Sequence, residues 1–485
     1  MKPHVIILMA DQLRADVLGK GITPNIDSLL EEGVDFQRTY CSCPLCVPAR
    51  GSFFTGTYPN RNGSLINPWE PRDAMYGNVK EGIKNLYEYM ESDWDSIHSG
   101  KQHLFTEGEK LEKRKDSKTK WYSTEESYKN FLRENKIPMP GGEKFRWRVP
   151  ELVNGLVTKV SNYSNAETGC YEYGEKYYFD SYFTECALDG LKKRDPSKPL
   201  LLNLMFLAPH PPLQIPEPWY SKIEKEDVEL PDNVGRYYSK QSPLQMYNLP
   251  GIIGSKYDRE SWKETWRVYL GLVAMLDQCV GRILEELKRQ RIYDDSLIIF
   301  TSDHGEMLGS HGLFQKMCIY EEAVRVPLFI KFPKNSGISK KSICQVVEHV
   351  DVFATLCDYL DLETPQFMDG KSLLPLVKGE KEEWDETAFI QYDGNGSRSN
   401  FQRCVIKGDY KLIVDFFKEE TFYELYCVGK DAQEKENLMF QEKYDGIARE
   451  LAALLAMHMV KTGDCLALPP FQPKKFREIY GFLEH

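Results

Sequence analysis

Three long apolar runs, each ending in polar residues, constrain the fold of this chain more than any other feature. They read HVIILMAD at 4–11, KPLLLNLMFLAPHPP at 198–212 and LIIFTSDHGE at 297–306. Continuous apolar runs of this kind are typical of strands that are buried on both faces of a parallel sheet. The segment 261–290, which precedes the third run, has the spacing and length of a helix. The order of strand, helix and strand predicts an α/β sandwich with a large, mostly parallel sheet.

The second half of the chain indicates a further unit. The chain of 485 residues is too long for one ordinary core. Residues 403–428 alternate between apolar and polar side chains as antiparallel strands do, and residues 445–463 follow as an amphipathic helix. We therefore predict a large α/β domain at 1–379 and a smaller C-terminal α+β subdomain at 380–485, with an antiparallel sheet.

Two segments stand apart from this plan. Residues 104–195 carry a highly charged stretch and are predicted to contain a solvated insertion in the large domain. The tail at 466–485 is rich in aromatic and other apolar side chains, and such a surface at a chain end has to be covered. We expect a homo-oligomer to cover it, with docking onto its own domain as the simpler alternative.

The composition narrows the class of protein and its partners. Hydrophobic residues make up 41% and charged residues 28% of the chain, as in soluble globular proteins. The net charge of −11 argues against nucleic acid or an anionic membrane as a partner, because both attract basic surfaces. The apolar run at 5–10 is too short to span a membrane, and the 12 cysteines show no paired zinc-type spacing. We therefore expect a cytoplasmic protein with reduced thiols.

Polar side chains follow two of the predicted strands at the point where each strand ends. Asp11 and Gln12 follow the first run, and Asp303 and His304 follow the third. A single carboxylate after a strand is often only a helix cap, but the carboxyl ends of parallel strands meet at one crevice. Two carboxylates, an amide oxygen and an imidazole suit a divalent cation such as Ca²⁺ or Mg²⁺, and the imidazole leaves room for Mn²⁺ or Zn²⁺.

The stretch CSCPLCVPARGSFFTG at 41–56 crowds three cysteines ahead of a helix start. A zinc site there would need further cysteine or histidine ligands nearby in sequence, and none follows. The motif from Cys46 to Arg50, followed by Thr55 and Gly56, resembles the type I sulfatase signature C-x-P-[SA]-R-x(4)-T-G. The resemblance extends over most of the chain, in order, through ADQLRAD at 10–16, TPNIDSLLEEGVDF at 23–36, GKQHL at 100–104, APHPP at 208–212 and TSDHGEMLGSHGLFQK at 301–316.

The resemblance implies an alkaline-phosphatase-like fold and the hydrolysis of sulfate esters. In such sulfatases a maturation enzyme oxidises the cysteine at the position of Cys46 to formylglycine (3-oxoalanine). The hydrated aldehyde offers one hydroxyl to attack sulfur, and deprotonation of the other releases sulfate. The implied ligands of one divalent cation, Ca²⁺ first, are Asp11, Gln12, Cys46, Asp303 and His304.

The resemblance also implies roles for the remaining polar residues. Arg50 would hold the diol, and Lys101 and Lys316 would clamp the sulfate oxygens. His103 would take the proton from the diol, and His210 would assist the leaving oxygen. The candidate substrate contacts are Asn67, Arg398 and Arg403.

Alternatives remain open at this point. Gln12 and His304 replace the Asp and Asn of many sulfatases and resemble the choline-sulfatase and phosphonate monoester hydrolase branch, so phosphonate or phosphodiester cleavage is an alternative. The pair Lys101 and His103 favours sulfate. A catalytically silent binding protein is a third hypothesis, although no site residue is missing. The expected substrate is a small anionic sulfate ester, such as a sulfated mono- or disaccharide.

Overall fold

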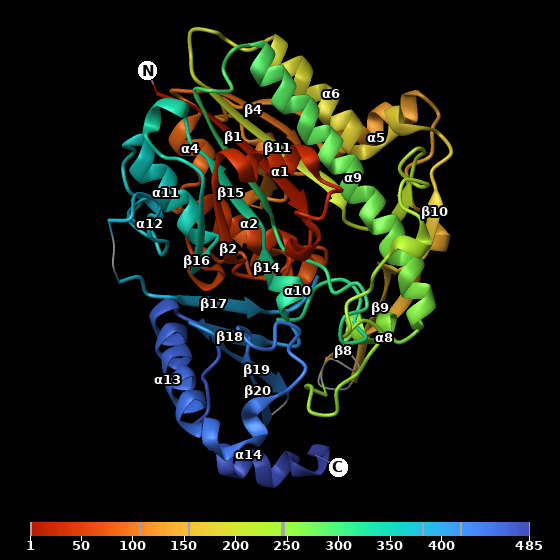
Figure 1. Ribbon diagram of the computed structural model, residues 1–485, viewed down its shortest axis with the longest axis vertical. Helices are drawn as coiled ribbons and strands as arrows, with labels where there is room; N and C mark the ends of the chain where they lie inside the picture. Colours follow the sequence, from red (N-terminus) through yellow and green to blue (C-terminus); the bar gives the residue numbers. More distant parts are fainter. Residues whose placement is uncertain are drawn as a thin grey trace.

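The computed structural model describes residues 2–106, 108–153, 156–243, 248–380, 383–417 and 420–484. Figure 1 shows a large unit around one sheet and a smaller unit, with its own sheet, at the C-terminal end. Parts of the predicted segments lie outside the described residues. They are residues 107 and 154–155 of the insertion, residues 381–382 beside the predicted domain boundary, residues 418–419 among the predicted antiparallel strands, and residue 485 of the tail.

The described part of the main sheet contains nine strands and is mostly parallel, as predicted. The parallel part consists, in spatial order, of β13 (Ser296–Ser302), β1 (His4–Asp11), β11 (Leu200–Pro209), β4 (Asp95–Gly100) and β7 (Lys120–Ser123). The other part consists of β15 (Leu328–Lys331), β2 (Val34–Tyr40), β14 (Arg325–Val326) and β16 (Lys341–Glu348). Of these, β15 runs antiparallel to β13 and β16 runs parallel to β2.

Helices cover both faces of this sheet, which explains why its central strands are apolar throughout. Along β1, Ile6 and Leu8 join the core on one face, whereas Val5 and Ile7 join the core on the other. The first face is covered by α1 (Pro24–Glu32), α6 (Phe179–Lys192) and α9 (Arg259–Arg289). The second is covered by α2 (Cys46–Thr55), α4 (Leu86–Met90) and α11 (Val350–Leu360). The predicted α/β sandwich is confirmed.

The range 104–195, predicted as a solvated insertion, contributes to this core. It supplies the edge strand β7 and the covering helix α6. It also contains α5 (Glu125–Glu134) and the antiparallel hairpin of β8 (Arg146–Val153) and β9 (Leu156–Ser164). Only part of the range therefore stands outside the main layers.

The smaller unit is built on a four-stranded antiparallel sheet, as predicted. Its strands are β17 (Thr387–Tyr392), β18 (Gln402–Lys407), β19 (Tyr410–Phe417) and β20 (Glu420–Cys427). One face packs on α13 (Asp445–Thr462) and α14 (Pro473–Tyr480). The other face places Ile390 and Ile413 against Tyr40 and Tyr320 of the large unit, so the two units share a buried core.

The aromatic tail docks, in part, on its own domain. Phe476 is 4% exposed, and its ring centroid lies 5.3 Å from that of Phe422 and 5.4 Å from that of Phe440. Phe482, by contrast, is 68% exposed. The predicted homo-oligomer stays a prediction. Among the described helices, none is both long enough and apolar enough to cross a membrane.

We expect Phe476→Ala to lower the free energy of unfolding by about 3–5 kcal/mol, since it removes a buried ring and leaves a cavity. Phe482→Ala is the matched control in the same tail and should change that free energy by less than about 0.5 kcal/mol. Urea titration followed by tryptophan fluorescence measures both. Equal stability of the two variants would contradict the docking of α14.

Candidate active site

The parallel pairing of β1 and β13 brings two carboxylates together. Ala10 lies opposite Ser302 in the register, so Asp11 and Asp303 come next on adjacent strands. The backbone N–H of Gln12 donates to Asp303 Oδ1 over 3.2 Å, and the backbone N–H of His304 donates to the same oxygen over 2.9 Å. Asp303 is thereby fixed at the edge of the sheet where the strand-end residues were predicted to meet.

Helix α2 carries Cys46 to this edge from a different part of the chain. Cys46 is its first residue, and Arg50 lies one turn further along the same side. Asn67 caps the helix, because its Oδ1 accepts the backbone N–H of Val47 over 3.1 Å. Gly56 ends the helix with a φ of 65°, and a Cβ there would collide with the sulfur of Met368. The glycine that closes the sequence motif therefore has a structural cause.

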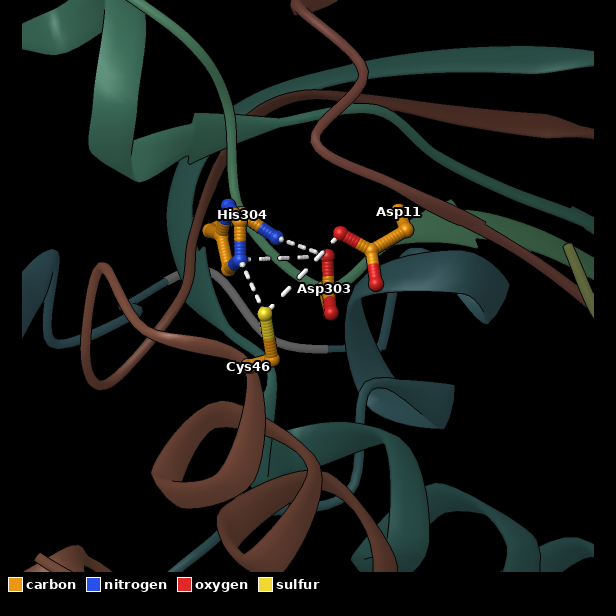
Figure 2. Close-up of side chains that lie close together, drawn as sticks. All are labelled: Asp11, Cys46, Asp303 and His304. Carbon is orange, nitrogen blue, oxygen red and sulfur yellow. Dashed lines mark hydrogen bonds and ion pairs between the residues drawn. The ribbon is translucent and has the colours of Figure 1, made fainter. Parts of the chain in front are cut away.

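Four buried side chains converge at the N-terminal end of α2 (Figure 2). The candidate ligand atoms of Asp11, Cys46, Asp303 and His304 all lie within 4.8 Å of one another. Cys46 Sγ is 3.2 Å from His304 Nε2 and 3.9 Å from Asp11 Oδ1. His304 Nδ1 donates to the carbonyl of Gly305 over 3.0 Å, which leaves Nε2 facing the cluster. The four groups form a candidate site for a divalent cation.

The fifth predicted ligand, Gln12, has both ends of its side-chain amide engaged. Its Oε1 accepts a hydrogen bond from Lys316 Nζ, and its Nε2 donates to Glu306 Oε2. Glu306 in turn accepts backbone N–H groups from Leu308 at 2.9 Å and from Gln315 at 2.5 Å. Glu306 thus orients the amide oxygen of Gln12 toward Lys316. The coordination of a cation by Gln12 stays a prediction.

Three basic side chains surround the carboxylates. Arg50 donates to Asp303 Oδ2 over 3.0 Å, to Asp11 Oδ2 over 3.2 Å and to the carbonyl of Lys101 over 2.8 Å. Lys101 Nζ forms an ion pair with Asp11 and lies 3.7 Å from Cys46 Sγ. With Lys316, they create a local positive field in a chain whose net charge is −11. An anionic substrate is compatible with such a pocket.

This field shifts the protonation of the groups at its centre. Burial and Asp11 raise the pKa of the Cys46 thiol, but Lys101, Lys316 and His304 outweigh them and hold that pKa well below its usual value. Burial also opposes ionisation of Asp11, yet Lys101 leads the groups that hold its pKa well below the ordinary range, and Arg50 adds to its effect. Asp11 is therefore anionic at neutral pH, and ionisation of the Cys46 thiol is favoured, which suits a bound cation.

The two histidines predicted to transfer protons have distinct partners. His103 Nε2 lies 3.1 Å from Glu125 Oε1, while its buried Nδ1 has no hydrogen-bond partner among the described residues. His210 Nδ1 donates to the carbonyl of Pro211 over 2.6 Å. Burial, followed by Lys316, lowers the pKa of His210 well below its usual value, so its imidazole is neutral at pH 7.

Two further candidate substrate contacts are engaged within the fold. Arg403 is 2% exposed, and its guanidinium bonds Asp464 at 2.5 and 2.9 Å and Asp393 at 3.0 Å. Arg398 donates to Cys465 Sγ over 2.7 Å and to Asp393 over 3.4 Å. These contacts favour a structural role for both arginines, just as the capping of α2 does for Asn67.

An α/β sandwich that gathers carboxylates, an imidazole and basic side chains at its strand ends has the arrangement of a hydrolase acting on anionic esters. The family model described as Sulfatase matches residues 3–362, and the one described as N-sulphoglucosamine sulphohydrolase, C-terminal, matches residues 309–461. The chain belongs to the sulfatase family and is a hydrolase acting on sulfate esters.

The chain is also similar to individual relatives and solved structures. The chain is 26% identical over 466 residues to an arylsulfatase of Clostridium perfringens, with 92% of each chain covered. It is 28% identical over 498 residues to the multifunctional alkaline phosphatase superfamily protein PehA of Trinickia caryophylli, covering 93% of this chain and 94% of the relative. The phosphonate monoester hydrolase of Agrobacterium radiobacter superposes with a TM-score of 0.76 at 23% identity, covering 95% and 96%. The predicted alkaline-phosphatase-like fold is confirmed.

We expect Glu125→Gln to lower kcat by about tenfold or more with little change in KM, because it weakens the hydrogen bond that orients His103. A positioned base contributes about 10²–10⁴-fold, and a misoriented one loses part of this. Glu126→Gln, an exposed neighbour in α5, is the control. An unchanged kcat in Glu125→Gln would contradict this role.

Proposed function

We propose that this chain hydrolyses a small sulfate ester and that Cys46 acts after conversion to formylglycine by a maturation enzyme. The position of Cys46 carries the proposal. Its sulfur stands at the start of α2, 3.7 Å from Lys101 Nζ and 3.2 Å from His304 Nε2, where nucleophile, cation and anionic substrate would meet. Membership of the sulfatase family supports the same chemistry.

The residues present fit both the modified side chain and the cation. Asp11, Asp303 and His304, with residue 46, would hold one divalent cation, and the oxygen-rich set favours Ca²⁺. A cation bound there would lower the pKa of a coordinated hydroxyl and offset the charge of a sulfate oxygen. Hydrated formylglycine would supply two hydroxyls on one carbon, one to attack sulfur and the other to lose a proton so that sulfate leaves.

The surrounding side chains can perform the remaining steps. Lys101 and Lys316 are placed to neutralise the sulfate oxygens, which is the main means of stabilising such a transition state. His103 is held by Glu125 through Nε2, so its free Nδ1 can accept a proton. Burial and then the charge of Lys316 lower the pKa of His210; a sulfate beside Lys316 would offset the second cause, and a protonated imidazole could then donate to the leaving oxygen.

A cavity beside His210 suits the alcohol part of a small ester. It has a volume of about 210 Å³ and is lined by aromatic residues including Tyr128 and Phe179. It adjoins a larger cavity of about 680 Å³, and Arg146 lines both. Together with the match to the N-sulphoglucosamine sulphohydrolase C-terminal model, this supports a sulfated mono- or disaccharide as substrate. The cytoplasmic location stays a prediction.

Cleavage of phosphonate monoesters or phosphodiesters is the second candidate function. The 28% identity to the multifunctional PehA favours it, as do Gln12 and His304 at the cation site. The pair Lys101 and His103 favours sulfate.

Protein with verified conversion of Cys46 should hydrolyse an aryl sulfate with a kcat/KM at least about 100-fold above that for the matched phosphodiester and phosphonate, a difference of about 2.7 kcal/mol. Lys101→Ala should lower kcat for the sulfate about 10²–10³-fold, because it removes charge stabilisation in the transition state. The exposed Lys113→Ala is the control. Faster hydrolysis of the phosphorus esters would establish the second function instead.

A further inference from the structure

A second cluster of candidate ligands lies outside the group around Cys46. The ligand atoms of His311, Glu322 and Glu434 lie within 4.8 Å of one another. His311 belongs to the loop that follows Asp303 and His304, Glu322 to α10 (Glu321–Val324), and Glu434 to the segment after β20. Figure 1 shows α10 at the junction between the main sheet and the C-terminal sheet. His311 is 0% and Glu434 1% exposed.

Several polar atoms of this cluster lack partners. Both ring nitrogens of His311 are buried; the backbone of Gln433 approaches the ring, but within the described chain no well-aligned hydrogen bond forms to either nitrogen. Oε2 of Glu322 and Oδ1 of Asn233 are also buried and have no hydrogen-bond partner among the described residues. The ring of His311 stacks on Tyr320 at 4.2 Å and an interplanar angle of 2°, which fixes the directions of its nitrogens. Buried polar atoms left unpaired are costly, so an ion or water is expected among them.

The carboxylates are held in place by their other contacts. Glu322 Oε1 accepts from Asn233 Nδ2 over 2.7 Å, which leaves Oε2 for a ligand. Glu434 Oε2 accepts the backbone N–H of Glu321 over 2.6 Å. Glu434 Oε1 lies 2.8 Å from Lys411 Nζ in an ion pair without hydrogen-bond geometry. Such outer contacts are what orients the ligands of a metal site.

The cluster carries more negative than positive charge, which favours binding of a cation. Lys411 pairs with both Glu321 and Glu434, at 3.0 and 2.8 Å, and Glu322 adds a third carboxylate. Arg325 approaches Glu321 only to 3.9 Å. One closely paired lysine therefore leaves negative charge in the cluster.

A cavity lies beside one of the three candidate ligands. It has a volume of about 180 Å³, is lined by Glu322 and Gln433, and also borders Asp16 and Arg325. A metal site needs a path for the ion besides the ligand set, and this cavity opens next to Glu322.

We propose that His311, Glu322 and Glu434 bind a second divalent cation, a transition metal for which Zn²⁺ is the best fit. An imidazole nitrogen with two carboxylate oxygens is a ligand set that Zn²⁺ accepts, and the site around Cys46 offers the same groups to the ion; Asn233 Oδ1 is the next available donor of the second site. The role of this cation is structural. It ties the loop that carries Asp303 and Lys316 to α10, where Glu306 N already donates to the carbonyl of Glu322 over 2.8 Å.

Equilibrium dialysis against Zn²⁺, followed by metal analysis, tests the proposal on the full chain. Wild type should bind two equivalents. Asp303→Asn removes a ligand of the site around Cys46 and should retain one equivalent, and His311→Gln should also retain one. His98→Gln is the matched control, because His98 is buried but bonds Tyr87 at 2.8 Å and Gly100 at 3.2 Å; it should bind as wild type does.

A second measurement does not depend on the folding of the His311 variant. Zn²⁺ should raise the Tm of Asp303→Asn, since a ligand that binds only the folded state stabilises it. Absence of bound Zn²⁺ in Asp303→Asn, or equal binding by His311→Gln and wild type, would overturn the second site. The loss of one Zn²⁺ equivalent in Asp303→Asn, taken by itself, tests only the site around Cys46.

Discussion

The contacts of one buried guanidinium join the separate parts of the catalytic site. Arg50 reaches Asp11 at the end of β1, Asp303 after β13 and the carbonyl of Lys101 after β4, with no exposed side-chain surface. Because it comes from α2, it also fixes the distance of Cys46 from these strands. Breaking a buried charge pair by removing one partner typically costs about 3–5 kcal/mol, so Arg50 supports the fold of the site as well as its charge.

Electrostatic consequences follow from this arrangement. The carboxylates that Arg50 bridges remain ionised in spite of burial, and they supply oxygen ligands to a cation. Lys101 and Lys316 add positive charge on the side of Cys46, where an anionic group would approach. A protein with a net charge of −11 can therefore act on an anion, since the pocket and not the whole surface determines the local field.

Much of this site could be predicted from the sequence because its residues stand at strand ends or in a compact motif. Asp11 and Asp303 follow apolar runs, and parallel pairing alone brings such positions together. Glu125 could not be predicted in this way. It follows Thr124 in a charged stretch, where the pattern indicates a helix start, and only the tertiary fold brings it to His103.

The contacts of other residues also could not be predicted from the sequence. Arg403 stands in a C-terminal strand with no local sign that Asp464, from the end of a distant helix, saturates it. Glu306 and His311 lie inside a motif that was already assigned to the active site, so their own contacts with Gln12 and with Glu322 gave no separate signal. Polar side chains that pair across a long stretch of chain follow no periodic pattern that can be seen in the sequence.

The central claim is that residue 46, as formylglycine, supplies the nucleophile in this buried cluster. The most direct test measures kcat for an aryl sulfate in preparations with graded conversion of Cys46, each quantified by mass spectrometry of the peptide that carries it. The account predicts that kcat is proportional to the converted fraction and falls to zero in Cys46→Ala. Full activity in protein with an intact Cys46 thiol would contradict it.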